Sequence, residues 1–191
     1  FAKMARRDYE SVVLIGEEVR EFWEVAKSIG RETPYLQDYV LGSKFSEALN
    51  KVETEINLER TLFVVSSLGP VYRYFYEKLT EVYAAQGISA EEIPSRVGEH
   101  FVRIMEANAP SDGEVSGGEF LRTFNVPEGI GAPYSIFSNA GLALLALRGE
   151  DIRGLVESGM KAVEMCTEEN PGAQLAAFQE VMSEAGRNRI V

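Results

Sequence analysis

Two short runs of mainly β-branched and aliphatic residues, 11–16 and 61–66, constrain the fold more than any other feature of the chain. Neither run alternates polar with apolar residues as a half-exposed strand does, so each is expected to form a strand buried on both faces. Each run is followed by a helical pattern, in which apolar residues recur at intervals of three and four over 17–29 and 70–85. Strands that alternate with helices predict a parallel sheet with helices on both faces.

The rest of the chain continues this alternation. Further strands are expected at 39–41, 99–105 and 121–126, and further helices at 43–55, 139–147, 151–165 and 171–185. The predicted fold class is therefore α/β, with a three-layer, doubly wound parallel sheet. Its 191 residues, 45% of them apolar, are expected to form a single domain over 1–191. Such sheets bind ligands at the carboxyl ends of their strands, where the strand order reverses.

Charge and cysteine content limit the partners and the setting. The formal net charge of -11 argues against nucleic acid or an anionic membrane surface as partner, because both are polyanions. The longest apolar run, 142–147, is far shorter than the roughly 20 residues that span a bilayer. Cys166 is the only cysteine, so no internal disulfide can form, and a reduced, cytoplasmic setting is expected. Residues 1–7 show no signal-peptide pattern.

Two loops that run into helices could hold a ligand. Ser66 and Ser67 follow the second buried strand, where hydroxyls and backbone N–H groups can hold a phosphate. The plainer alternative is that a serine in this turn merely caps the next helix. The second loop, 128–141, contains glycines that permit a tight backbone path, and its Ser138 could likewise be only a helix cap. Residue types alone leave both alternatives open.

Metal and acid–base chemistry have little support in the sequence. His100 is the only histidine, so no site with two histidines can form, and no metal and no cofactor are expected. His100 lies at the start of an expected strand, where a structural role is expected. The paired acids Glu17 and Glu18 are expected to complement a helix dipole rather than to act as a catalytic pair.

Five residues within 128–141 have the spacing of a known signature: Gly131, Tyr134, Ser135, Ser138 and Gly141. They match the phosphoglucose isomerase signature, Gly-Gly-Arg-Tyr/Phe-Ser followed by a second serine three residues later and then a glycine. Weaker matches follow the family's order at 9–16, 58–67, 74–77, 98–102, 169–172 and 185–187. The chain resembles the first sugar-isomerase (SIS) domain of glucose-6-phosphate isomerases, most closely the isomerase half of the fused transaldolase/glucose-6-phosphate isomerase enzymes.

The chain also departs from this family at its ligand loops. Pro133 occupies the position of the signature arginine, and a proline cannot supply the charge or even a backbone hydrogen bond. The loops after Gly16 and Ser67 are each shorter than in the family by roughly five to eight residues. Either both loops are deleted in this chain, or the printed sequence joins the ends of longer loops.

The resemblance implies an aldose–ketose isomerase of glycolysis and gluconeogenesis that interconverts glucose 6-phosphate and fructose 6-phosphate. It implies that the sugar phosphate is contacted by Ser66, Ser67, Gly131, Ser135 and Ser138. The reaction needs a carboxylate base, a ring-opening acid and a cation near the developing oxyanion. In the family the catalytic glutamate, histidine and lysine belong to a second SIS domain and the tail after it. No catalytic residue is therefore assigned here, and little or no isomerase activity is expected of this chain alone.

The resemblance further implies that this domain pairs with a second SIS domain, in the same chain or in a homodimer. Two alternatives to an isomerase domain remain. The chain could be a non-catalytic SIS module that binds a phosphosugar or a protein partner. It could also be an engineered or divergent scaffold that keeps only the core pattern.

Overall fold

The computed structural model describes residues 8–29, 36–41, 52–106, 120–129 and 136–165, with the single residues 5, 49, 172, 174, 177, 178 and 181. The chain divides into two compact units, residues 1–150 and 151–191. All elements from the first strand to α6 belong to the first unit, and α7 belongs to the second. The single domain expected over 1–191 stays a prediction.

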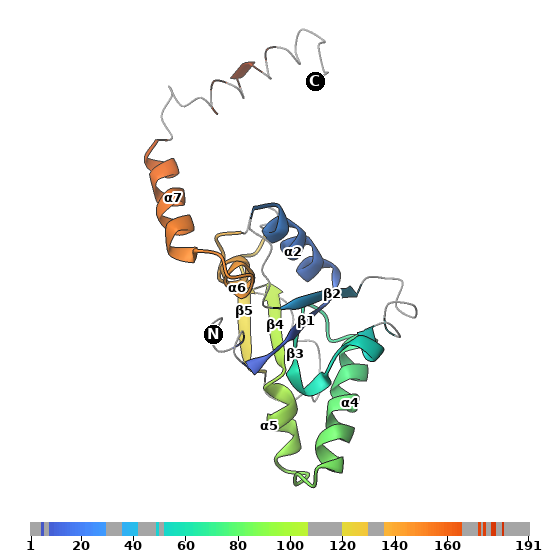
Figure 1. The fold of residues 1–191 in the computed structure, drawn as a ribbon. Coiled ribbons are helices and arrows are strands. Elements are labelled where there is room, and N and C mark those ends of the chain that lie inside the picture. The colour runs from blue at the N-terminus through green and yellow to red at the C-terminus, as the bar shows by residue number, and fades with distance from the viewer. Residues whose placement is uncertain are drawn as a thin grey trace. The chain divides into compact units, whose positions relative to one another are not determined.

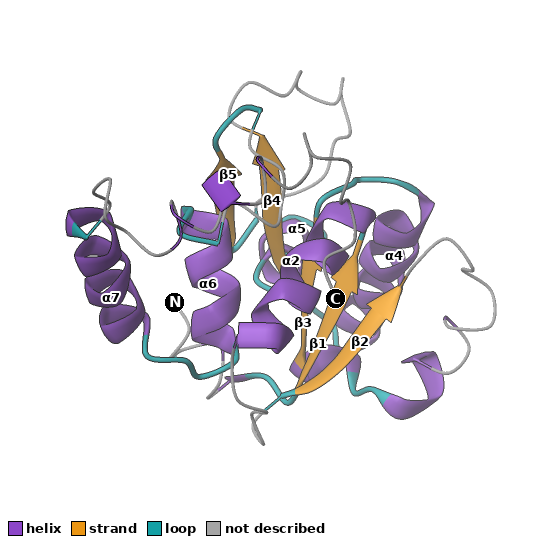
Figure 2. Ribbon diagram, turned by 90° about the horizontal axis from the view of Figure 1, so that it is seen from above, coloured by secondary structure: helices purple, strands orange, loops and turns teal. Residues whose placement is uncertain are grey.

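The first unit contains a five-stranded, all-parallel sheet in the order β2-β1-β3-β4-β5 (Figure 2). Its strands are β1 (Ser11–Ile15), β2 (Gln37–Leu41), β3 (Thr61–Val65), β4 (Phe101–Glu106) and β5 (Arg122–Val126). The central strands β1 and β3 are buried along their whole length, as expected for runs with no polar alternation. The observed architecture confirms the predicted α/β fold class.

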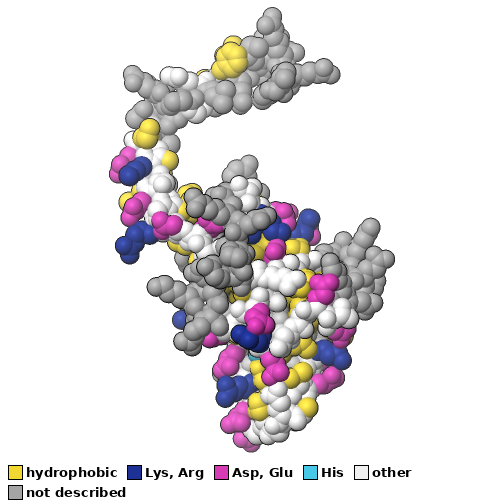
Figure 3. All heavy atoms as spheres, in the orientation of Figure 1, with side chains coloured by type: hydrophobic (Ala, Val, Ile, Leu, Met, Phe, Trp, Pro, Cys, Tyr) yellow, Lys and Arg dark blue, Asp and Glu magenta, His cyan; other side chains and the backbone are white. Residues whose placement is uncertain are grey.

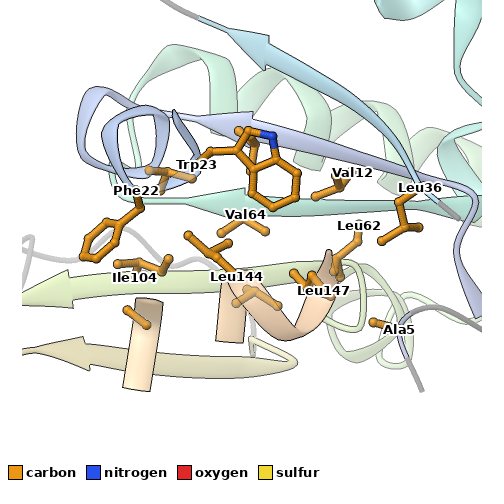
Figure 4. Close-up of a cluster of buried hydrophobic side chains, with 14 of the residues drawn as sticks. Ala5, Val12, Phe22, Trp23, Leu36, Leu62, Val64, Ile104, Leu144 and Leu147 are labelled. Carbon is orange, nitrogen blue, oxygen red and sulfur yellow. The ribbon is translucent and has the colours of Figure 1, made fainter. Parts of the chain in front are cut away.

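Helices cover both faces of this sheet (Figure 1). On one face lie α2 (Glu17–Ile29) and α6 (Asn139–Leu147). Their buried side chains, including Phe22, Trp23 and Leu144, pack on Val64 of the sheet (Figure 4). The opposite face is covered by α4 (Pro70–Ala85) and α5 (Ile93–Gly98).

Packing on the α4 face depends on aromatic side chains. Phe63 of β3 lies 4.7 Å from Phe75 of α4 and 5.0 Å from Phe101 of β4, measured between ring centroids. Tyr72 meets Phe101 edge-on at 5.0 Å. The rings of Phe63, Phe75 and Phe101 are at most 1% exposed, so they form the centre of this half of the core. The apolar spacing predicted for 70–85 is thus a packing face.

Some element boundaries differ from those expected. Strand β4 begins at Phe101 rather than residue 99, because the His100 N–H still bonds to the Val97 carbonyl in the turn after α5. Helix α5 was not expected, because its six residues are too few to show a clear helical period. A short 3-10 helix, η1 (Leu58–Arg60), precedes β3. Of the helices expected over 43–55 and 171–185, only parts lie within the described residues, and Cys166 lies outside them.

The second unit contributes one described helix, α7 (Ile152–Glu164), near the expected bounds. Asp151 caps it, since its carboxylate accepts a hydrogen bond from the Gly154 N–H at 3.1 Å. In the described part of the chain, no helix is long and apolar enough to cross a bilayer.

Candidate functional site

The strand order places a crevice between β1 and β3. From β1 the chain proceeds outward to β2 on one side, while β3 continues to β4 and β5 on the other. Ile15 and Val65 are the last residues of β1 and β3, and they pair in register. The switch point of the sheet therefore lies at the carboxyl ends of these two strands. In open α/β sheets this is the place where ligands bind.

Gly16 and Ser66 meet at this point, each directly after its strand. Gly16 has φ +111°, a conformation that L side chains rarely adopt. A Cβ at Gly16 would overlap the Ser66 hydroxyl, so the missing side chain is what makes room for that serine. The Ser66 N–H donates to the Ile15 carbonyl at 3.0 Å, which extends the β1–β3 ladder by one bond. The close approach of these two loops depends on the glycine.

A cavity of about 330 Å³ opens beside this contact. The residues that line it come from the ends of β1 and β2 and from the starts of α2 and α4: Ile15, Gly16, Glu17, Leu41, Ser67, Gly69, Pro70 and Val71. Its size is that of a small-molecule site, and it lies at the carboxyl ends of neighbouring strands. Its lining residues are mostly apolar and include one serine, Ser67, and one acidic residue, Glu17.

The start of α4 adds hydrogen-bond donors to the cavity. Gly69 is the N-cap of α4 and brings no side chain that could bond to the first-turn N–H groups. Pro70 follows at the first helical position, where its missing N–H costs nothing. Val71, next in the helix, lines the cavity. The N–H groups of a first helical turn carry partial positive charge and favour an anion.

The start of α2 carries the opposite charge. Glu17 lines the cavity, and its carboxylate accepts a hydrogen bond from Arg20, one turn further along the same helix. Burial raises the pKa of the neighbouring Glu18 carboxyl, and the charges of Glu106 and Glu21 raise it further. The acidic residues predicted at the helix start do lie in its first turn. This end of the sheet therefore combines helix-terminal donors with carboxylates.

The structure brings together only part of the predicted sugar-phosphate site. Ser67 is exposed and lines the cavity, and half-buried Ser66 lies beside it against Gly16. Ser138 is on another element, and it is not among the described residues that line the cavity. Gly131 and Ser135 lie outside the described residues, as does Pro133. Whether these five residues contact a ligand stays a prediction.

Two positions of the 128–141 signature have a local structural role. The Ser138 hydroxyl accepts a hydrogen bond from the Gly141 N–H at 3.2 Å and so caps α6. A Cβ on Gly141 would lie only 2.7 Å from the Cα of Ile136, so a larger residue would collide with the backbone there. These two residues fix the tight entry of the chain into α6. Ser138 therefore does cap this helix, and its predicted contact with a ligand stays a prediction.

His100 lies at the opposite end of the sheet and is only 4% exposed. Its Nδ1 lies 3.0 Å from the Thr61 carbonyl oxygen, which can only accept, so Nδ1 carries the proton. Its Nε2 then accepts from the Tyr83 hydroxyl at 2.5 Å. Burial lowers the pKa of His100. These contacts join β3, α4 and the start of β4, which supports a structural role.

Most of the residues that line the cavity were not predicted from their residue types. Leu41, Gly69 and Val71 carry no chemical signal in the sequence, yet all three line the cavity. The signal that could have found them is positional, because each lies at the end of a strand or the start of a helix on one side of the sheet. Among the residues that the structure describes, no group of three or more His, Cys, Asp or Glu side chains could hold a metal ion.

The distribution of charged side chains can be followed on one face of the molecule. On the face drawn in Figure 3, acidic and basic side chains are interspersed. Exposed ion pairs fit this pattern, such as Lys27 with Asp38 at 2.9 Å and Arg60 with Glu10 at 2.7 Å. The described residues therefore show no broad basic face on that side.

Comparisons with known proteins find only distant relatives. No family model matches the sequence. The chain is 24% identical over 162 residues to a glucose-6-phosphate isomerase from Carboxydothermus hydrogenoformans, and the match covers 82% of this chain and 33% of that protein. The chain thus spans about a third of the length of its curated relative.

Two solved structures share the fold. A glucose-6-phosphate isomerase from Chlamydia trachomatis matches with a TM-score of 0.53 and 24% identity, over 77% of this chain and 28% of that one. A hypothetical protein from Thermus thermophilus matches with a TM-score of 0.63 and 19% identity, over 94% of this chain and 45% of that one. The chain is therefore distantly similar to glucose-6-phosphate isomerase and has a fold that occurs in that enzyme.

Proposed function

We propose that this chain is a SIS domain of the glucose-6-phosphate isomerase type, which binds a sugar phosphate in the cavity beside Gly16 and Ser67. The observation that carries the proposal is the cavity at the β1/β3 switch point, since it lies where such a sheet binds ligands. The distant similarity to glucose-6-phosphate isomerase suggests glucose 6-phosphate or fructose 6-phosphate as the ligand. The resemblance to the fused transaldolase/isomerase enzymes belongs to the same proposal.

The phosphate group is proposed to lie near the start of α4. The Ser67 hydroxyl and the first-turn N–H groups of α4 can donate to phosphate oxygens. The adjoining apolar wall from Ile15, Leu41 and Val71 suits the carbon face of a sugar. Ser66 is proposed to contact the same group from behind Gly16. Gly131, Ser135 and Ser138 remain further proposed contacts from the signature.

Little or no isomerase activity is proposed for the chain alone. Enediol chemistry requires a base, a ring-opening acid and a cation around the same sugar. The cavity wall, within the described residues, offers one carboxylate, from Glu17, and no imidazole or basic side chain. The missing groups would come from a second SIS domain, in a longer chain or in a homodimer. A role in glycolysis or gluconeogenesis, in the cytoplasm, is proposed only for this chain together with that partner.

Calorimetric titration with glucose 6-phosphate tests the binding site. Saturable heat is expected for the wild type. Ser67→Ala is expected to weaken binding about tenfold, because a hydrogen bond to a charged group is lost. Ser28→Ala is the matched control, since this exposed hydroxyl donates to the Val25 carbonyl of its own helix, near the end of α2 away from the cavity. Absence of heat with both glucose 6-phosphate and fructose 6-phosphate would refute the proposed function.

A coupled assay separates a binding module from an enzyme. Purified protein is expected to convert fructose 6-phosphate no faster than a buffer control. Rapid conversion by the chain alone would show that the proposed inactivity is wrong. It would leave the proposed binding site standing.

A further inference from the structure

The described residues that line the proposed site include no basic side chain, although its ligand would be a dianion. Ser67 and the N–H groups of α4 are neutral donors, and Glu17 is the only ionisable side chain among the described residues that line the cavity. A carboxylate at this position opposes a phosphate group. An anion site beside Glu17 therefore needs a cation within reach.

Arg20 is placed to be that cation. Its Nη2 donates to Oε1 of Glu17, which itself lines the cavity. Helical side chains lean toward the N-terminus of their helix, so the guanidinium is held over the first turn of α2. The guanidinium thus contacts the carboxylate of a residue that lines the cavity, while Arg20 itself is not among the lining residues. Every atom of this arrangement belongs to described residues.

We infer that Arg20 holds the phosphate of the bound ligand, and that this phosphate replaces Glu17 as the partner of the guanidinium. The inference rests on the proposed function and assigns a residue to its phosphate subsite. Glu17 and Arg20 form a latch: in the empty site the carboxylate holds the guanidinium beside a residue that lines the cavity, and in the loaded site the carboxylate is displaced.

Replacing Glu17 by a phosphate as the partner of Arg20 costs little free energy. The Arg20 and Glu17 side chains are 45% and 60% exposed, and an exposed ion pair of this kind contributes little net stability. A phosphate offers the guanidinium two parallel charge-assisted hydrogen bonds and a larger charge than a single carboxylate. The partial positive charge at the start of α4 favours the same group from the other side of the cavity. Both effects favour a phosphate group in the cavity, and the first favours its contact with Arg20.

A second exposed arginine–glutamate pair provides the control. Arg60 of η1 and Glu10 lie 2.7 Å apart, with side chains 50% and 54% exposed. These residues precede β3 and β1, so the pair lies at the amino ends of the strands, opposite the cavity. Arg60→Gln changes the net charge by one unit, as Arg20→Gln does. It leaves the site untouched.

The experiment is calorimetric titration of glucose 6-phosphate into five proteins: wild type, Arg20→Gln, Arg20→Lys, Glu17→Gln and Arg60→Gln. Arg20→Gln is expected to weaken binding at least about tenfold, and Arg20→Lys to recover part of that loss. Glu17→Gln is expected to bind several-fold tighter than wild type, because the competing carboxylate is gone. Arg60→Gln is expected to stay within about twofold. Circular dichroism melts confirm that each variant is folded.

The outcomes separate the two proposals. If the wild type binds and Arg20→Gln binds within about twofold of it, the inference is overturned and the proposed function stands. Equal weakening by Arg20→Gln and Arg60→Gln also overturns the inference, because a general charge effect would explain both. Weaker binding by Glu17→Gln contradicts the displaced latch. A wild type that binds no sugar phosphate overturns both proposals.

Discussion

A single glycine decides how closely the two central loops can approach. Gly16 has positive φ, and the Ser66 hydroxyl occupies the space where a side chain would be. The first property is common to turn glycines, whereas the second is specific to the β1/β3 crevice. A pair of glycine variants can separate these two contributions.

Gly16→Ala is expected to lower the free energy of unfolding by about 2 to 4 kcal/mol, because backbone strain and a collision with Ser66 add together. Gly87→Ala is the control, since Gly87 also has positive φ (+81°) but has no atom within 4 Å of the added Cβ. It is expected to cost only about 1 kcal/mol, from strain. Urea denaturation measures both. Equal losses would show that the collision with Ser66 does not matter.

At the scale of elements, buried hydrogen bonds tie the helices to the sheet at the end away from the cavity. His100 joins β3 and α4 through its two ring nitrogens, and Trp23 of α2 donates to an Asp38 oxygen of β2 at 2.8 Å. Lys27 of α2 pairs with the same carboxylate. Burial is the largest single influence on Asp38 and acts to raise its pKa, but the hydrogen bonds from Lys27 and Trp23 and the charge of Lys27 together keep that pKa below its ordinary value. These links hold a helix from each face onto the sheet.

Protonation of His100 is expected to destabilise the fold in mild acid. Its pKa is lowered in the folded state, mainly by burial, so below about pH 6.5 the unfolded chain binds a proton more readily than the folded one. The stability that depends on neutral His100 is therefore present above pH 6.5 and declines as the pH falls below it. A protonated ring could also no longer accept from the Tyr83 hydroxyl.

The measurement is urea denaturation of wild type and His100→Gln at pH 7 and pH 5. His100→Gln is expected to be less stable at pH 7, yet to lose less stability than the wild type between the two pH values. Comparing the two losses removes the contribution of carboxylates that both proteins share. Identical losses would show that His100 does not titrate in this range.

At the scale of the whole molecule, ligand binding and folding are linked. A ligand that binds only the folded state raises the free energy of unfolding, by about 2.7 kcal/mol at a concentration of 100 times its Kd. Glucose 6-phosphate is therefore expected to raise the melting temperature of the chain in a concentration-dependent manner. Glucose at the same concentrations is the control for the phosphate group. An unchanged melting temperature at saturating glucose 6-phosphate would contradict binding to the folded chain.

Local patterns in the sequence determined most of the elements. The runs at 11–16 and 61–66 are apolar on both faces, so they could only be central strands, and the helical periods of α2 and α4 are equally plain. The position of Ser66 and Ser67 after a buried strand followed from the same patterns. Helix α5 was missed because six residues are too few to show a period.

Only the tertiary structure decided what lies around those serines. The order β2-β1-β3 places Leu41 beside Ile15, and it turns the start of α2 toward the start of α4 across one cavity. Strand order depends on pairing between segments far apart in the chain, which hydrophobic periodicity does not encode. The same is true of the contact between Gly16 and Ser66 and of the placing of Glu17 at the cavity. The sequence by itself determined that this chain builds a covered parallel sheet, and the folded structure decided which side chains meet at its switch point.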